Sequence, residues 1–169
     1  MTTAIDTLLG DITTVDYDAI VNAANTSLLG GGGVDGAIHR AAGPKLLAEC
    51  RTLHGCPTGQ AKLTPGYHLP CRYVLHTVGP IITGPVTRRD QALLASCYRA
   101  CLALAEAHGL ASVAFCCIST GEFHFPNDLA AQIAADTVSA WQRDHPQAPA
   151  VVFNVFKDED RALYEALLR

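Results

Sequence analysis

Apolar positions recur along this chain in two alternating patterns, short uninterrupted runs and longer stretches with helical spacing. The short runs predict buried strands at residues 3–9, 19–22, 72–78, 112–118 and 151–156. The longer stretches predict helices at residues 34–42, 45–54, 89–108 and 158–169, and another helix opens at Pro126 and Asn127. Residues 60–70 are rich in turn formers instead, and residues 81–88 are expected to form an exposed loop.

The predicted helix at residues 89–108 has the clearest periodicity. Its apolar face is formed by Leu93, Cys97, Cys101 and Leu104, and Gly109 follows as a C-cap. The helix that opens at Pro126 and Asn127 also has an apolar face, which is formed by Ala130, Ala134, Val138 and Trp141. Strands that alternate with helices predict an α/β fold, a three-layer sandwich around a mainly parallel sheet.

In such sheets ligands bind where loops leave the carboxyl ends of the strands. The polar segments after Asn22 and Ile118 are two such loops.

The chain shows no internal repeat, no low-complexity tract and no linker, so residues 1–169 are expected to form one domain.

Composition narrows the class of protein. Of the 169 residues, 49% are hydrophobic and 17% are charged, which is typical of a globular protein. The net charge of −4 argues against unassisted binding to a nucleic-acid backbone. No signal peptide and no membrane-spanning run is apparent, so a cytoplasmic location is expected. The seven cysteines include no Cys-x-x-Cys pair and are expected to be free, buried thiols.

Four consecutive glycines, at residues 30–33, dominate the first of these loops. Each glycine costs about 0.5–1 kcal/mol of extra chain entropy relative to alanine, so the run suggests a functional backbone cradle rather than an ordinary flexible loop. Gly31, Gly33 and Gly36 satisfy G-x-G-x-x-G, but they begin too far after the strand for a dinucleotide fingerprint. No Lys-Ser or Lys-Thr follows them, which excludes a P-loop.

Neither polar loop carries a cation, because residues 22–38 and 115–127 contain no Lys or Arg. Both lead into helix N-termini, where backbone N–H groups bind phosphate. Two such loops suggest a pyrophosphate clamped from both sides. Two interpretations of Asp35 remain open: it stabilises the start of the helix, or it contacts a hydroxyl or a water near the phosphates.

Several motifs together resemble the macrodomain signature over nearly the whole chain. They are Gly10-Asp-Ile-Thr13, Asn22-Ala-Ala-Asn25, the stretch from Leu28 to Gly43, Thr58-Gly-Gln-Ala-Lys62, His76-Thr-Val-Gly-Pro80 and Ile118-Ser-Thr-Gly121. The most similar branch is that of the MacroD-like ADP-ribosyl hydrolases. The resemblance implies a three-layer α/β/α sandwich with a mixed, mainly parallel six-stranded sheet and a cleft for ADP-ribose.

The resemblance also implies roles for individual residues. Asp11 would accept the adenine amino group beside the Ile12 N–H, and Phe156 would stack on the adenine. Asn25 would hold the distal ribose, Asp35 would lie near its anomeric carbon, and His39 would support that corner. The two phosphate loops would be formed by Gly32, Gly33 and Val34 and by Ser119, Thr120, Gly121, Glu122 and Phe123.

The expected activity is removal of mono-ADP-ribose from ester-linked Asp or Glu side chains, and deacetylation of O-acetyl-ADP-ribose. Asp35 and a substrate phosphate would activate the water, because the nearby pyrophosphate raises the pKa of the carboxyl group. Expected partners are ADP-ribose, ADP-ribosylated proteins and ADP-ribosylated nucleic-acid ends, with a monomer as the default state and no cofactor. The alternative is a module that binds ADP-ribose without turning it over; a nucleotide phosphatase would need a metal-binding acidic cluster that the sequence does not show.

The second loop departs from many relatives. Its sequence from Glu122 to Pro126 resembles the zinc-dependent macrodomain branch, whose metal ligands come from a Cys/His-bearing insert in the first loop. Plain glycines stand there in this chain, so no metal is expected. Glu122 and His124 either narrow the distal-ribose pocket or face solvent.

Overall fold

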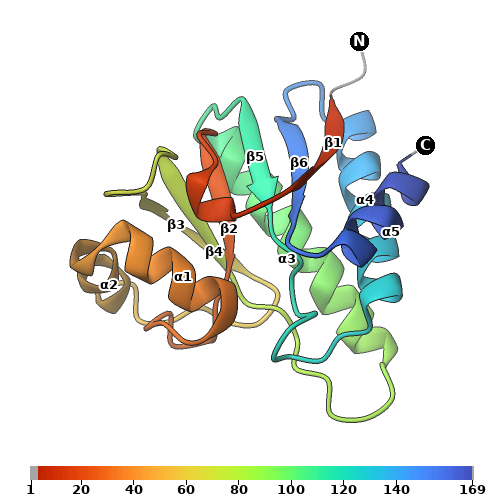
Figure 1. Cartoon of the computed structure of the whole chain (residues 1–169), viewed down its shortest axis with the longest axis horizontal. Helices are drawn as coiled ribbons and strands as arrows, with labels where there is room; N and C mark the ends of the chain where they lie inside the picture. The colour runs from red at the N-terminus through yellow and green to blue at the C-terminus, as the bar shows by residue number, and fades with distance from the viewer. Residues whose placement is uncertain (1–3, 169) are drawn as a thin grey trace.

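A six-stranded sheet forms the centre of the computed structural model, which describes residues 4–168 (Figure 1). The strand order is β1-β6-β5-β2-β4-β3. The strands are β1 (Ile5–Leu9), β2 (Ala19–Ala23), β3 (Ala61–Pro65), β4 (Tyr73–Thr77), β5 (Ser112–Phe115) and β6 (Ala150–Val155). Strand β3 pairs antiparallel with β4, and the other neighbouring strands pair in parallel. The predicted mixed, mainly parallel sheet is confirmed.

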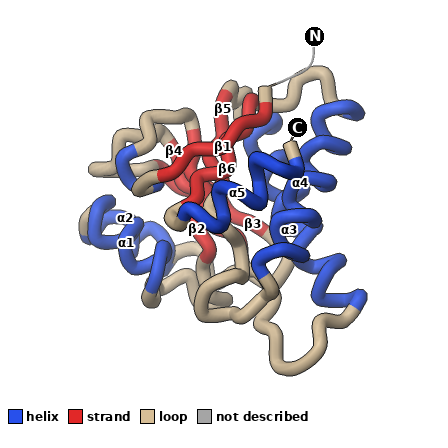
Figure 2. Tube along the Cα trace, turned by 45° about the vertical axis from the view of Figure 1, so that its right-hand side comes forward, coloured by secondary structure: helices blue, strands red, loops and turns tan. Residues whose placement is uncertain are grey.

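Helices cover both faces of this sheet. They are α1 (Gly33–Ala42), α2 (Pro44–Arg51), α3 (Arg88–Ala107), α4 (Asn127–Asp144) and α5 (Asp158–Leu167), with a short 3-10 helix at Ile12–Thr14. Helices α1 and α2 pack together on one face, against β2 and β3. Helices α3, α4 and α5 form the layer on the other face (Figures 1 and 2). This is the three-layer arrangement that the alternation of elements predicts.

Aromatic rings fill the core between the sheet and the second helical layer. The rings of Phe153 and Tyr164 stack with their centroids 4.6 Å apart, and those of Tyr98 and Phe115 lie 4.9 Å apart. All four side chains are buried. All seven cysteines are free thiols, six of them buried, with Cys117 partly exposed. The prediction of free, buried thiols is therefore confirmed for six of them.

The sequence pattern missed one strand. Residues 60–70 were expected to be turns, yet β3 (Ala61–Pro65) occupies part of this segment as the edge strand of the sheet. An edge strand is stabilised by pairing with a single neighbour, so its side chains need not follow a clear apolar pattern. The predicted strand at 112–118 is too long, because β5 ends at Phe115 and residues 116–118 leave the sheet while staying largely buried.

The helices agree with the sequence pattern except at some ends. Gly43, with φ of 87°, ends α1, and Pro44 begins α2 at once. Helix α2 stops at Arg51 rather than at residue 54, since His54 has a positive φ of 58°. Thr3 and Arg169, which were expected to belong to the first strand and the last helix, lie outside the described residues.

Between residues 4 and 168, no helix combines the length and the apolar character needed to cross a membrane.

The stacked aromatic core gives a prediction about stability. Phe153→Ala removes a ring that is 1% exposed, and we expect the free energy of unfolding to fall by about 3–5 kcal/mol. Phe156→Ala, only three residues away, removes a ring that is 82% exposed and should change it by less than about 0.5 kcal/mol. Urea denaturation followed by circular dichroism measures both. Equal losses in the two variants would contradict this description of the core.

Candidate functional site

A cleft of about 530 Å³ opens at the carboxyl ends of the central parallel strands. Gly10 after β1, Ala23 at the end of β2, Cys116 after β5 and Phe156 after β6 all line it. Its volume is that of a typical small-molecule site. The sequence predicts a ligand at this edge of the sheet, and the structure has a cleft there.

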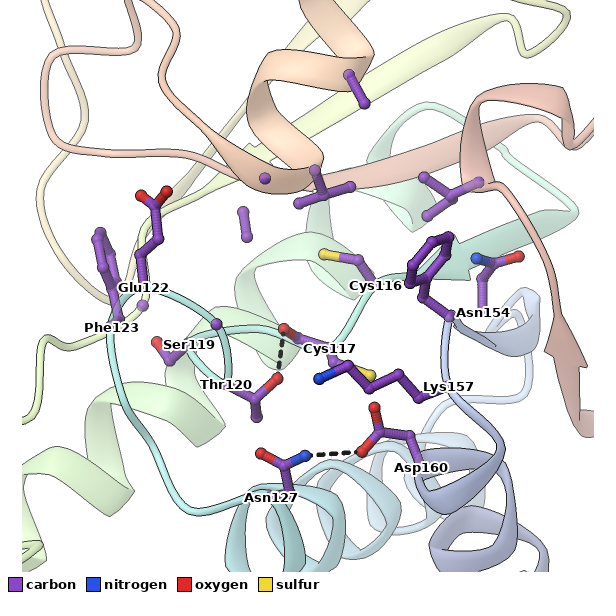
Figure 3. Close-up of a pocket in the computed structure, with 18 of the residues that line it drawn as sticks. Cys116, Cys117, Ser119, Thr120, Glu122, Phe123, Asn127, Asn154, Lys157 and Asp160 are labelled. Atoms are coloured by element: carbon purple, nitrogen blue, oxygen red, sulfur yellow. Dashed lines mark hydrogen bonds between the residues drawn. The ribbon is translucent and has the colours of Figure 1, made fainter.

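The predicted ligand-binding residues gather around this cleft, apart from Asn25 and Asp35. Those that line it are Asp11, Ile12, Gly32, Gly33, Val34, Ser119, Thr120, Gly121, Glu122, Phe123 and Phe156. Glu122 and Phe123 mark one end of the cleft, and Asn154 and Lys157 lie toward the other (Figure 3). The predicted catalytic residues Asn25, Asp35 and His39 do not line the cleft itself; they lie behind the glycine loop, residues 30–33.

The glycine loop leads directly into helix α1. Gly32 is the N-cap residue and offers no side chain to cap the helix, while Gly33 adopts a left-handed φ of 56°. The first N–H groups of a helix have no partner within the helix, so uncapped ones are free to bind an anion. This loop therefore presents backbone donors to the cleft, as the glycine run predicts.

The loop also lies very close to its own helix. A Cβ atom on Gly31 would sit 3.2 Å from Asp35 Oδ2 and 3.6 Å from Asn25 Nδ2. A Cβ atom on Gly36 would collide with the carbonyl oxygen of Gly31. Glycine is thus required at position 36, where a Cβ atom would overlap a backbone carbonyl, whereas a Cβ atom at position 31 would only press on the Asp35 carboxylate.

The second loop is held in an equally constrained form. Ser119 has a positive φ of 66°, and its Oγ packs so closely on Gly79 that a Cβ atom there would overlap it. The Oγ is buried and has no hydrogen-bond partner among the described atoms. The loop is closed by hydrogen bonds from Phe125 N to Ser119 O, 2.8 Å, and from His124 N to Gly121 O, 3.1 Å. The cleft therefore lies between two loops that are held by close contacts and hydrogen bonds.

One end of the cleft is built around Asp11. Its carboxylate accepts hydrogen bonds from the Thr13 hydroxyl, 2.7 Å, and from the Thr13 N–H, 2.9 Å. These bonds lower the pKa of Asp11, so it remains an ionised acceptor. Phe156 lines the same cleft with its ring 82% exposed, which leaves the ring free to stack on a flat group.

Asp35 lies in a buried polar environment behind the glycine loop, outside the lining of the cleft. Its side chain is buried, and its Oδ1 accepts a hydrogen bond from Asn22 Nδ2 at 2.9 Å. His39 Nε2 lies 3.4 Å from the same oxygen. Burial raises the pKa of Asp35, and the nearby Glu122 adds to this, whereas Asn22 and His39 oppose it. From the sequence we expected a bound pyrophosphate to raise the pKa of Asp35; in the structure, burial already raises this pKa.

Asn25 shapes the loop around Asp35. Its Nδ2 donates to Gly30 O at 2.9 Å, and its Oδ1 accepts from Ser27 Oγ at 2.5 Å and Ser27 N at 3.1 Å. Asn25 therefore holds the glycine loop in place in this structure, a role that the sequence did not predict.

Sequence reasoning missed several residues that line the cleft. They are Gly10, Ala23, Ala37, Gly79, Cys116, Cys117, Asn127, Asn154, Lys157 and Asp160. Lys157 is the one cation among the described lining residues, and it extends along the cleft near Asp160 (Figure 3). Asn127 Nδ2 donates to Asp160 Oδ1 at 2.8 Å and joins α4 to α5. Lys157 could have been predicted as a cleft residue from the sequence, because it directly follows the predicted ligand-binding residue Phe156.

The chemistry of the site rests on backbone donors and a few carboxylates. Within residues 4–168, no three His, Cys, Asp or Glu side chains are grouped so that they could hold a metal ion. Glu122 lines the cleft and packs its carboxylate against Gly32, while His124 is exposed to solvent. Both side chains are exposed, but only Glu122 lines the cleft; whether it narrows the distal-ribose pocket stays a prediction.

Comparison with known proteins gives consistent results. The family described as Macro domain matches residues 21–134. A macro domain-containing protein of Ralstonia nicotianae is 59% identical over 99% of this chain and 95% of its own length. Human ADP-ribose glycohydrolase MACROD2 is 52% identical over 98% of this chain, which spans 39% of that protein. The structure of a Trypanosoma brucei macrodomain in complex with ADP-ribose has a TM-score of 0.91, with 46% identity over 98% of this chain and 69% of the other.

The contact between the glycine loop and α1 gives a second prediction about stability. Alanine at position 36 would gain up to about 1 kcal/mol of helix propensity, but its Cβ would collide with the Gly31 carbonyl. We expect the collision to dominate, so that Gly36→Ala lowers the free energy of unfolding by about 1–3 kcal/mol. Gly121→Ala is the matched control, because a Cβ there meets nothing within 4 Å. Urea denaturation compares them; a stabilised Gly36→Ala protein would contradict the close contact.

Proposed function

Because this chain belongs to the Macro domain family, we propose that its cleft binds ADP-ribose and that the protein is a hydrolase that removes mono-ADP-ribose. The single observation that supports this most strongly is the pairing of two cation-free backbone loops across one cleft, with a buried carboxylate behind one of them. Similarity to proteins named ADP-ribose glycohydrolase and protein-ADP-ribose hydrolase supports the same activity.

The ligand would lie along the cleft from Asp11 to the glycine loop. The adenine amino group would donate to Asp11, which is an ionised acceptor. The adenine ring would stack on Phe156, whose ring is exposed. The diphosphate would bind the free N–H groups of the loops around Gly33 and Ser119. The distal ribose would then reach the end near Asp35.

Hydrolysis would use Asp35 as the group that activates water, assisted by a substrate phosphate. Burial raises the pKa of this carboxyl group and makes it a stronger base than an exposed aspartate. Asp35 is buried, so it would act through one water at the edge of the glycine loop. His39, 3.4 Å from its Oδ1, would keep the carboxylate in place, and Asn25 would orient the ribose and the loop together.

The proposed substrates are mono-ADP-ribosyl esters of Asp or Glu side chains, together with O-acetyl-ADP-ribose. In each, an ester joins a carboxylic acid to the distal ribose, which is the part of the ligand that would lie beside Asp35. ADP-ribosylated proteins, and ADP-ribosylated nucleic-acid ends, are the proposed macromolecular partners, and we propose that the protein acts as a monomer in the cytoplasm.

One observation favours a second candidate, a module that binds ADP-ribose without turning it over. Asp35 is only 4% exposed, and both polar atoms of the Asn25 side chain are already used within the glycine loop. A module would need the same cleft but would not need Asp35 to reach a water. The two functions therefore differ in what happens when the carboxylate is removed.

Asp35→Ala distinguishes the hydrolase from the module. For the hydrolase we expect the rate of ADP-ribose release from an ester-linked acceptor to fall by about 10²–10⁴-fold, since a general base supplies about that much. Binding of free ADP-ribose, measured by calorimetry, should remain within tenfold of the wild type. Asp144→Asn, an exposed site at the end of α4, is the matched control and should retain full activity. Unchanged release by Asp35→Ala would contradict the role of Asp35.

The adenine end gives a separate prediction about binding. Phe156→Ala should weaken ADP-ribose binding by about 1–3 kcal/mol, the usual contribution of one base stacked on an aromatic ring. Phe156→Tyr keeps the ring and should bind within about threefold of the wild type. Calorimetry with ADP-ribose measures both variants. If Phe156→Ala binds as tightly as the wild type, adenine does not stack on this ring.

A further inference from the structure

A continuous row of buried hydrogen bonds runs through the sheet to Asp35. Thr64 Oγ1 lies 2.9 Å from His76 Nε2, and His76 Nδ1 lies 3.1 Å from Asn22 Nδ2. Asn22 Nδ2 lies 2.9 Å from Asp35 Oδ1. Thr64, His76 and Asn22 are completely buried, on three neighbouring strands. None of these three side chains lines the cleft, and the proposed mechanism does not use them.

The direction of each hydrogen bond in this row follows from simple chemistry. The amide nitrogen of Asn22 can only donate, so it gives one hydrogen to Asp35 Oδ1 and the other to His76 Nδ1. His76 is therefore neutral at Nδ1 and carries its hydrogen on Nε2, which donates to Thr64 Oγ1. The Thr64 hydroxyl donates onward to Pro65 O at 3.1 Å. Only one hydrogen of this row is donated to Asp35, and it comes from Asn22. The other donors, on Asn22, His76 and Thr64, each donate to the next group away from Asp35.

The environment of His76 keeps it neutral. Burial lowers the pKa of His76 to about 3, and repulsion by His39 adds to this effect. An imidazolium would carry a hydrogen on Nδ1 and would press it against the Asn22 amide group. The tautomer of His76 and the orientation of Asn22 therefore depend on each other.

The reversed orientation of Asn22 would favour a different form of Asp35. It would turn Oδ1 of the amide toward the carboxylate, which is repulsive unless Asp35 is protonated. In the observed orientation that Oδ1 is buried and has no partner among the described atoms. Leaving a buried acceptor unpaired costs free energy, so other contacts must hold the amide in this orientation. The hydrogen bonds of Asn22 Nδ2 to Asp35 Oδ1 and to His76 Nδ1 are the contacts that do so.

We propose that Asn22 and His76 are positioning residues that hold the Asp35 carboxylate in its ionised form, with Thr64 fixing the tautomer of His76. The proposal rests on the function given above, in which Asp35 activates water. The other charged or titratable groups around Asp35 are His39 on its own helix, Glu122 from the second loop and the Cys50 thiol of α2. Glu122 favours the protonated carboxyl group and His39 opposes it, so the hydrogen bond from Asn22 supports the ionised form.

The test is the pH dependence of kcat for release of ADP-ribose from an ester-linked acceptor. Activity falls at low pH when Asp35 becomes protonated, and this acid limb follows its pKa. Asn22→Leu removes the donor to the carboxylate and should move the limb up by about one pH unit or more. Thr64→Val, which touches no part of the cleft, should move it up by about half a unit, while kcat near pH 8 and KM stay within about twofold.

Thr77→Val is the matched control. Thr77 is also a completely buried threonine of the sheet, but its hydroxyl donates to Gln60 O and takes no part in the row. Its acid limb should stay at the wild-type pH even if the fold becomes less stable. The same shift in Thr77→Val would overturn the proposal. Equal limbs in Thr64→Val and the wild type would overturn it if the carboxyl resonance of Asp35, described next, does not shift either.

A second measurement works without hydrolysis and separates this proposal from the proposed function. The ¹³C carboxyl resonance of Asp35 in the ligand-free protein, identified by its loss in Asp35→Ala, reports its pKa directly. It should titrate at higher pH in Thr64→Val than in the wild type. If the resonance shifts but the acid limb does not, the positioning role stands and Asp35 is not the base. If the resonance does not shift, the positioning role is wrong.

Discussion

The cleft depends on one close approach, that of the backbone at Gly31 to the first turn of α1. The Gly31 carbonyl lies against Gly36, and a Cβ atom at Gly31 would sit 3.2 Å from the Asp35 carboxylate. A Cβ atom at Gly36 would overlap the Gly31 carbonyl oxygen. Beside this contact, the N-terminus of α1 has no side-chain cap because its N-cap residue is Gly32, and Asp35 is buried directly behind the loop. Backbone donors and a buried carboxylate thus arise from the same piece of packing.

Such an arrangement has an electrostatic consequence. A phosphate bound close to Asp35 would repel the ionised carboxylate and so raise its pKa. Burial raises the pKa in the same direction. A carboxyl group subject to both effects is a stronger base, but only in its ionised form, which hydrogen bonds stabilise. Asn22, held by His76, supplies such a bond, and this explains why polar side chains occupy the interior of the sheet at this point.

Much of this could be predicted from the sequence, and the failures have physical causes. The glycine run and the second loop were recognisable because loops without Lys or Arg that lead into helix N-termini suit the binding of an anion by backbone N–H groups. Strand β3 was missed because an edge strand needs little apolar pattern, and the sixth strand was expected only from the family resemblance. The residues of α4 and α5 that complete the cleft, such as Asn127 and Lys157, come together only through tertiary packing. The same is true of the row through His76, whose members are more than ten residues apart in sequence.

The most direct test of the account is a crystal structure of the protein with ADP-ribose bound. The account predicts adenine between Asp11 and Phe156, the diphosphate on the backbone N–H groups of both loops, and the anomeric carbon of the distal ribose within reach of Asp35 through one water. A distal ribose lying instead at the end of the cleft formed by Lys157 and Asp160, with adenine beside the glycine loop, would contradict it.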